Sequence, residues 1–430
     1  MSEATVGNAS EASSNRAADG SLLAADGTPL RKKLAEALFI SRLRAFGLVT
    51  PLLLLLTLTF LLPIVIFLGR GVHNDTYASN MPNSTPLLAS WDGASEPTEA
   101  MYAALVADLV KARENKTIGR IATRVNREVS GSRSLFTSSA RKAKKLEAPF
   151  KEALIGIKKD WAKIEIWQGM KVASQSFTPT YVLAALDYKY VGDGSIRPQN
   201  EERQIYVTLF LRTLEISTLV TIFTLLLGYP IAFLLSTLPL RTSNLLLIMV
   251  LLPFWTSILV RTTAWIGILQ SQGVLNDLLV FFGVTSNDAR FSLIYNKLGT
   301  LIAMTHILLP FMVLPLYSVM KTIPPYYVRA AKSMGATDWT AFWRVYFPQT
   351  VPGIGAGAIL VFILAIGYYI TPALVGGQDG QMISNFIDFH MRRSLNWSLA
   401  AALGLVLMAF VLFLYWLYDR IVGIDNMKMG

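Results

Sequence analysis

Side chains that could bind a metal or perform catalysis are few in this sequence and widely spaced. The chain has no cysteine, which excludes disulfides, thiolate nucleophiles and cysteine-ligated metals. Its three histidines, His73, His306 and His390, are far apart and show no i, i+4 pairing, the spacing typical of a metal-binding helix. The sequence lacks a Gly-x-x-x-x-Gly-Lys-Ser/Thr phosphate loop. We therefore expect no catalytic residues, no metal and no cofactor bound by this chain.

Other polar and aromatic residues are suited to contacting a solute. Asp277 and Asp388 are the carboxylates that we would test first for binding an amine, although most exposed carboxylates bind nothing. Tyr368 and Tyr369 offer ring faces that attract ammonium groups. The alternative for both tyrosines is a place in the aromatic belt of a membrane interface.

Two apolar segments carry irregular or charged residues that could line the path of a solute through the membrane. Thr371, between Gly367 and Pro372, lies in an interruption of an apolar run, and broken helices are tolerated where they line a cavity or pack on protein. Trp265 shares a helical side with Arg261, and an arginine within a span is a functional candidate. Alternatively, the Arg261 guanidinium reaches the membrane surface. If the Arg261 side chain faces the path of the solute, it would favour an anionic solute or form a pair with Asp277.

The elements that must position these residues are membrane-spanning helices. Of 430 residues, 53% are hydrophobic and 16% are charged, against about a quarter charged in soluble domains. We expect an all-α, polytopic membrane protein, since six apolar runs reach the ~20 residues that cross a bilayer. They cover about 46–68, 206–235, 244–265, 298–320, 354–374 and 399–422.

Charge distribution sets the expected topology and domains. Arg31, Lys32 and Lys33 precede the first span and favour a cytoplasmic N-terminus, and an even span count returns the C-terminus to that side. The same rule accounts for the net charge of +11 without nucleic acid. We expect a disordered tail (1–37), a first transmembrane helix (38–70), a polar insert outside the cytoplasm (71–205), a core with five transmembrane helices (206–423) and a cytoplasmic C-terminus (424–430).

The insert at 71–205 is predicted to be mostly helical. Apolar residues recur at helical spacing after Glu99, and a second helical pattern covers 148–174. The basic run Arg141–Lys145 is interpreted as a solvated face, with contact to membrane lipid as the alternative.

The stretch RAAKSMGATDWTAFWRVYFPQTVPG, 329–353, separates two spans and is basic and aromatic. We expect one helix from Tyr326 to Met334, a left-handed bend at Gly335, and a second helix that Thr337 or Asp338 caps and Pro348 ends. The second helix places Trp339, Phe342, Trp343, Tyr346 and Phe347 on one face. This face suits either the membrane surface or a groove on a cytoplasmic partner.

This stretch resembles the EAA loop of ABC-importer permeases in its Ala330-Ala331, Gly335, Phe342, Val345 and Pro348, followed by Pro352-Gly353. Further motifs are similar to the spermidine/putrescine-type subfamily, and the match covers about 206–423. They are GYPIAFLLSTLP (228–239), LLPFWTSILVRTTAWIGIL (251–269), GVLN (273–276), LLPFMVLPLYSVM (308–320) and GYYITPALVGG (367–377).

The resemblance implies a bacterial inner-membrane permease whose coupling loop, 324–352, docks on a separate ATPase. It further implies ATP and Mg on two ATP-binding subunits, a second permease subunit that is a different chain, and a periplasmic solute-binding protein. The solute would be a polyamine, or else an opine, an amino-acid derivative or a ferric complex. Coupling would involve Arg329, Ala330, Ala331, Gly335, Asp338, Trp339, Phe342, Val345 and Pro348.

Two departures from the family pattern stand out: Arg329 replaces the glutamate that opens the family loop, and the insert is unusually long. We expect an acidic group opposite Arg329 in the partner's cleft. Two other functional classes are alternatives to the importer. An ATP-independent transporter would show inverted repeats or mid-span ionisable residues, and a membrane enzyme would need a catalytic pair at a recognisable spacing.

Overall fold

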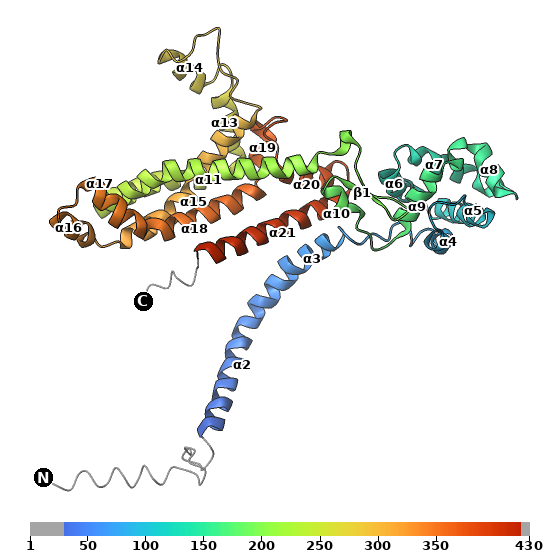
Figure 1. The fold of residues 1–430 in the computed structure, drawn as a ribbon, viewed down its shortest axis with the longest axis horizontal. Coiled ribbons are helices and arrows are strands. Elements are labelled where there is room, and N and C mark those ends of the chain that lie inside the picture. The colour runs from blue at the N-terminus through green and yellow to red at the C-terminus, as the bar shows by residue number, and fades with distance from the viewer. Residues whose placement is uncertain (1–29, 423–430) are drawn as a thin grey trace, which may run out of the picture. The chain divides into compact units, whose positions relative to one another are not determined.

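The computed structural model describes residues 30–422 (Figure 1), and these fall into two compact units that meet between Phe67 and Leu68. Expectations for 1–29 and for 423–430 lie outside the described residues. Among the described residues, helix dominates and the strands are limited to one short hairpin. The expected all-α fold is confirmed.

The first helical run is longer than the predicted span. It consists of α2 (Leu30–Leu56), a π-helical turn η1 (Thr57–Leu61) and α3 (Leu62–Gly69). Residues 30–37, expected in a disordered tail, are helical. The stretch Ala37–Gly69 is long and apolar enough to cross a membrane. Pro63 follows the π turn, where wider hydrogen bonding accommodates the missing amide donor.

The insert is mostly helical, as predicted. Its elements are α4 (Ser84–Ser90), α5 (Glu99–Glu114), α6 (Ile118–Glu128), α7 (Ser132–Lys142), η2 (Ala143–Lys145), α8 (Phe150–Ile157), η3 (Lys159–Ala162), α9 (Ile164–Ser174), α10 (Thr180–Ala185) and the antiparallel strands β1 (Tyr188–Tyr190) and β2 (Ile196–Pro198). Its helices pack around buried Tyr102, Phe136, Trp161 and Trp167. This aromatic core gives the insert a hydrophobic centre separate from that of the spans.

A buried carboxylate ties two insert helices together. Asp108 of α5 is fully buried, and its oxygens accept from the backbone amides of Asn83 (3.1 Å) and Ser84 (2.7 Å) where α4 begins. The Asn83 amide and the Ser84 hydroxyl also donate to it, both at 2.8 Å. Four donors satisfy the carboxylate and cap an otherwise unpaired helix start.

The core follows as η4 (Glu201–Arg203), α11 (Tyr206–Thr237), α12 (Leu240–Leu251), η5 (Leu252–Trp255), α13 (Ile258–Leu269), α14 (Val274–Phe281), α15 (Lys297–Thr322), α16 (Tyr326–Ser333), α17 (Asp338–Ala341), the π-helical η6 (Phe342–Tyr346), α18 (Phe347–Gly367), α19 (Ile370–Val375), α20 (Ile383–Arg392) and α21 (Trp397–Val422). Helices α11, α15 and α18 form its packed centre (Figure 1). Close approach depends on glycine: a Cβ on Gly228 would lie 3.1 Å from the Met312 side chain, and one on Gly357 would lie 2.7 Å from the Met312 sulfur.

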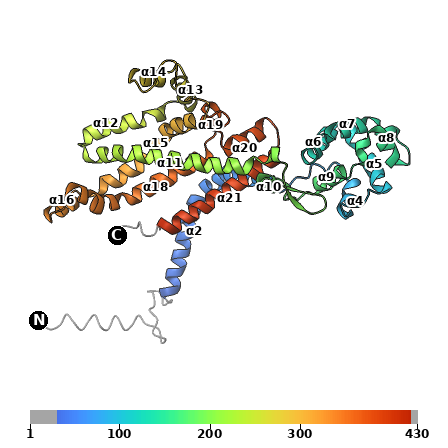
Figure 2. The ribbon, with the colours of Figure 1, turned by 45° about the horizontal axis from the view of Figure 1, so that its top comes forward.

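The predicted third span, 244–265, is wrong as a continuous helix. The chain bends by 97° between Leu240–Trp255 and Ile258–Phe281, and Figure 2 shows α13 turning away from α12. Pro253 cannot donate to the helix, and Thr256 and Ser257 are extended. Five described helices are long and apolar enough to span a membrane, or six if this bent pair counts as one span.

Candidate functional site

The bend at Gly335 separates two helices at the end of the core remote from the insert (Figure 1). Gly335 has φ +89°, its amide donates to the Lys332 carbonyl (2.9 Å), and the Ala336 amide donates to the Ala331 carbonyl (3.0 Å). This pair of bonds is a Schellman motif. Thr337 then caps α17 by accepting from the Thr340 amide. The predicted helix, bend and cap are confirmed.

The second helix of this segment does not end at Pro348, contrary to the prediction. Residues Asp338–Gly367 form one helical run, with the π turn η6 at its start and Pro348 in the first turn of α18. The Phe347 amide bonds back five residues to the Phe342 carbonyl. A wide turn and a first-turn position both tolerate a proline without an amide donor. The segment is therefore an extension of the fifth span rather than a separate short helix.

The predicted aromatic face divides between the core and the surface. Phe342 and Tyr346 lie edge-on to Phe233 of α11, with ring centroids 6.0 and 5.4 Å away. Trp339 and Trp343 remain 72% and 44% exposed and contact each other edge to face. Packing against α11 thus leaves an exposed pair of tryptophans next to the bend.

The other predicted coupling residues differ in exposure. Ala331 is buried and Val345 is half-buried, whereas Arg329, Ala330, Gly335 and Pro348 are exposed. Asp338 forms an ion pair with Lys332 across the bend. Within residues 30–422, the Arg329 side chain has no ion-pair partner.

The fifth span breaks where the sequence predicted. Helix α18 ends at Gly367, Tyr368 is extended, and α19 begins at Ile370. Helix α20 donates to the carbonyls at the break: the Ser384 hydroxyl donates to Tyr368 O (2.6 Å) and the Asn385 side-chain amide donates to Tyr369 O (2.7 Å). Such partners allow irregular backbone within a membrane bundle.

Helix α13 packs against α19 beside this break. Thr371 is fully buried, with its hydroxyl 3.3 Å from that of Thr262. Trp265 lies about one turn further along α13, and its indole donates to His306 Nδ1 of α15 (3.2 Å). Arg261 of the same helix donates to the carbonyls of Pro253 and Thr256. Arg261 therefore satisfies the bend before α13 and is not paired with Asp277.

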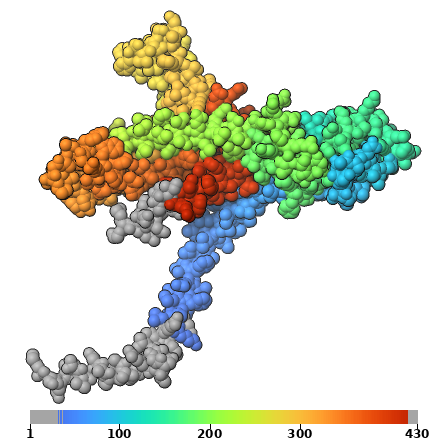
Figure 3. Space-filling model, in the orientation of Figure 1, coloured from blue at the N-terminus to red at the C-terminus, as the bar shows by residue number. Residues whose placement is uncertain are grey.

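The two candidate carboxylates are far apart and each is paired with an arginine. Asp277 lies on α14, which projects from the bundle (Figure 3), and accepts from Arg290 (2.8 Å). Asp388 of α20 accepts from Arg392 Nε (2.7 Å), and Arg392 Nη2 also donates to the Tyr369 hydroxyl (3.4 Å). The structure thus joins Tyr369 and Asp388 through one arginine and leaves Asp277 apart.

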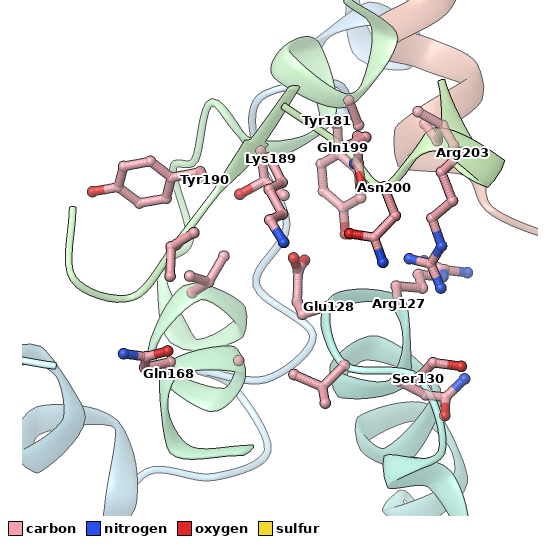
Figure 4. A pocket seen from close by; sticks show the side chains of 18 of the residues that line it. Arg127, Glu128, Ser130, Gln168, Tyr181, Lys189, Tyr190, Gln199, Asn200 and Arg203 are labelled. Carbon is pink, nitrogen blue, oxygen red and sulfur yellow. The ribbon is translucent and has the colours of Figure 1, made fainter. Parts of the chain in front are cut away.

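Sequence reasoning missed a cavity of about 600 Å³ between the insert and the start of α11 (Figure 4). Side chains of both signs line it, among them Arg127, Glu128, Lys189 and Arg203, and Figure 4 shows Glu128 directed toward Lys189. The contributing segments are distant in sequence, so no local pattern could predict it.

A buried histidine lies near this junction. His390 Nε2 is 2.9 Å from the Tyr206 hydroxyl and Nδ1 is 2.8 Å from Ser394 Oγ. Burial, with a smaller contribution from the charge of Arg127, lowers the pKa of His390 to about 4. His390 is therefore neutral at neutral pH and acts as a hydrogen-bonding link between α20 and α11.

Comparison with known proteins places the core in a family. Residues 215–422 match the family model "Binding-protein-dependent transport system inner membrane component". The chain is 34% identical over 222 residues to the spermidine/putrescine transport system permease protein PotB of Haemophilus influenzae, covering 51% of this chain and 77% of that protein. It is 30% identical over 254 residues to the inner membrane ABC transporter permease protein YdcU of Escherichia coli, covering 56% and 77%.

A solved bacterial ABC transporter for the import of alginate has 21% identity and a TM-score of 0.40, covering 52% of this chain and 81% of its own. That likeness is too weak to carry an argument. The family model and the relatives, of which this chain covers 77% at 30–34% identity, show the family. The chain belongs to the binding-protein-dependent transport system inner membrane components, the permease subunits of ABC importers.

Proposed function

We propose that this chain forms the translocation path of an ATP-driven importer for a polyamine-like solute in the bacterial inner membrane. The observation that carries the proposal is the 34% identity, over 222 residues, to a permease named for spermidine and putrescine transport. The complete importer would contain two ATP-binding subunits holding ATP and Mg, a second and different permease chain, and a periplasmic solute-binding protein. Both chain termini would be cytoplasmic, and the insert would be periplasmic.

The surface around the bend is the proposed contact with the ATPase. Trp339 and Trp343 are large, exposed and adjacent, and partly buried aromatic anchors supply much of the energy of protein interfaces. Arg329 is exposed on the preceding helix and has no ion-pair partner among residues 30–422, so an acidic group in the partner's cleft would pair with it. The Schellman bend at Gly335 fixes the angle between these two parts of the surface.

The break in the fifth span is the proposed solute contact. Tyr368 and Tyr369 combine ring faces with hydroxyl groups, and Thr371 follows them in α19, in contact with Thr262 of the helix that also carries Trp265. Aromatic faces attract ammonium groups, which is the chemistry that a polyamine presents. The Asp388 carboxylate would release Arg392, its present ion-pair partner, and bind the ammonium group of the solute instead.

A second candidate solute carries a carboxylate, as opines and amino-acid derivatives do. Arg392 favours it, because its guanidinium lies 3.4 Å from the Tyr369 hydroxyl and could bind an oxyanion there. Substituting Arg392→Gln separates the two candidates: a polyamine importer keeps or gains uptake, whereas an importer of a carboxylate solute loses it.

Reconstitution with the cognate ATPase and binding protein tests the proposal. We expect ATP-dependent uptake of radiolabelled spermidine into proteoliposomes, and loss of ATPase co-purification in Trp339→Ala/Trp343→Ala. Phe177→Ala, which removes an aromatic side chain 75% exposed on the insert, is the matched control. Uptake by this chain alone, without ATP, would identify a secondary transporter and contradict the proposal.

A further inference from the structure

A second cavity at the junction of the insert and the core is strongly basic. It has a volume of about 970 Å³ and lies against the linker after α3, helix α6 and the loop between α20 and α21. One carboxylate, Asp75, lines it. The basic side chains that line it are Arg70, Arg120, Arg124, Arg127, Arg133 and His73.

Most of these arginines have unused donors. Across the described residues, Arg70, Arg120, Arg127 and Arg133 form no ion pair with a carboxylate. Arg127 donates to the Leu395 carbonyl (2.9 Å), and Arg70 lies over the Trp397 ring at 5.7 Å. Five arginines with only Asp75 in the lining and Glu128 on Arg124 as counter-charges repel one another, so a bound anion would stabilise the arrangement.

Arg124 is the buried arginine of this cavity whose donors are least satisfied. Its side chain is 1% exposed, and only Nη1 bonds, to Glu128; Nε and Nη2 are buried without a hydrogen-bond partner. Its face is covered by the Tyr181 ring, 5.2 Å away. A guanidinium presents its donors in its own plane. Nε and Nη2 share one edge of that plane, and Arg124 is one of the residues that line the cavity, so an anion that reaches this edge would satisfy both donors.

We infer that this cavity binds a phosphate-type oxyanion, which links the insert to the core. A tetrahedral oxyanion has enough acceptor oxygens for several guanidinium groups at once, and arginine suits bidentate recognition of phosphate. The anion would bridge α6 of the insert with the loop before α21. It is either free in solution or the headgroup of an anionic phospholipid.

The position of the cavity bears on the source of the anion. Arg70 directly follows a candidate span, Ala37–Gly69, and Trp397 begins another, Trp397–Tyr418; basic and aromatic residues at span ends are typical of the level where lipid headgroups meet water, which favours a headgroup. The cavity is also open to solvent through the exposed Arg120 and Arg133. The inference concerns the insert and is independent of the transported solute.

Two measurements on the purified full-length chain distinguish the sources. Inorganic phosphate is titrated calorimetrically into protein in a non-ionic detergent. Retained lipid is measured by native mass spectrometry after extraction from nanodiscs of phosphatidylcholine, with or without phosphatidylglycerol. The test variant is Arg120→Gln/Arg133→Gln, because both side chains are exposed and their loss should not impair folding. The control, Arg141→Gln/Lys142→Gln, removes the same charge from the exposed end of α7 outside the cavity.

We expect the wild type to bind saturably and the test variant to bind at least about tenfold more weakly, which is the effect of losing a charge-assisted hydrogen bond. The control variant should bind as tightly as the wild type. Phosphate binding without retained phosphatidylglycerol indicates a free oxyanion. Retained phosphatidylglycerol that phosphate displaces indicates a lipid headgroup. The substitution Arg124→Gln should abolish the binding of phosphate or of phosphatidylglycerol, and thermal unfolding of this variant checks that it still folds. Absence of both kinds of binding in the wild type, or equal binding by wild type and test variant, would overturn the inference.

Discussion

In the proposed importer, Gly335→Ala is expected to impair coupling to the ATPase without loosening the membrane core. Gly335 holds φ +89°, and an added Cβ would have no atom beyond its chain neighbours within 4 Å. The substitution therefore acts through backbone conformation alone. A left-handed conformation costs an L-residue about 1–2 kcal/mol, which shifts the equilibrium between this bend and alternatives by roughly 5- to 30-fold. The two Schellman bonds that end α16 would be lost in the shifted population.

The assay compares ATP-dependent uptake and ATPase co-purification for three variants of the reconstituted importer. Gly335→Asn should be impaired less than Gly335→Ala, because asparagine enters the left-handed region more readily. Gly156→Ala is the control: Gly156 lies in α8, also has open space around its Cβ, and has no positive φ. Thermal unfolding should be similar for all three. If Gly335→Ala matches Gly156→Ala in uptake and co-purification, the bend does not set the docking geometry.

Three further predictions concern stability, each measured by thermal unfolding of the full chain. Burial lowers the pKa of His390 to about 4, whereas in the unfolded chain this histidine takes up a proton below about pH 6.5. The free energy of unfolding should therefore fall by about 2 kcal/mol between pH 7.5 and pH 5. The substitution His390→Gln should remove most of this pH dependence. Asp108→Asn should cost at least about 2 kcal/mol, since it weakens charge-assisted bonds to the start of α4; Asp160→Asn, an exposed control, should cost little. Gly357→Ala should cost about 1–3 kcal/mol, because its Cβ would lie 3.2 Å from a backbone carbonyl of α15, whereas Gly267→Ala has open space; equal costs would contradict the packing argument.

Features set by neighbouring residues were predictable from the sequence. Gly335 and Thr337 mark the end of one helix and the start of the next through local backbone requirements, and Gly367 with Pro372 marks the break in the fifth span. The apolar runs likewise indicated the spans because length and composition suffice to recognise them.

Features set by tertiary packing were not predictable. Pro348 continues a helix because η6, which packs on Phe233, widens the turn before it. The 97° bend before α13 depends on Arg261 folding back onto two carbonyls, which no periodicity reveals. The paired state of Asp277 and the two cavities beside the insert likewise arise from segments that are distant in sequence.

The unbroken helix from Asp338 to Gly367 has a mechanical consequence. Thirty residues at about 1.5 Å each make a strut of roughly 45 Å, whose two ends are the exposed tryptophan pair and the Tyr368 break. A strut transmits displacement instead of absorbing it. In the proposed importer, a tilt that the ATPase imposes at Trp339 would therefore displace the solute-facing break at Tyr368 at the same time. A flexible glycine pair inserted midway along α18 should leave docking intact while disconnecting ATP hydrolysis from transport.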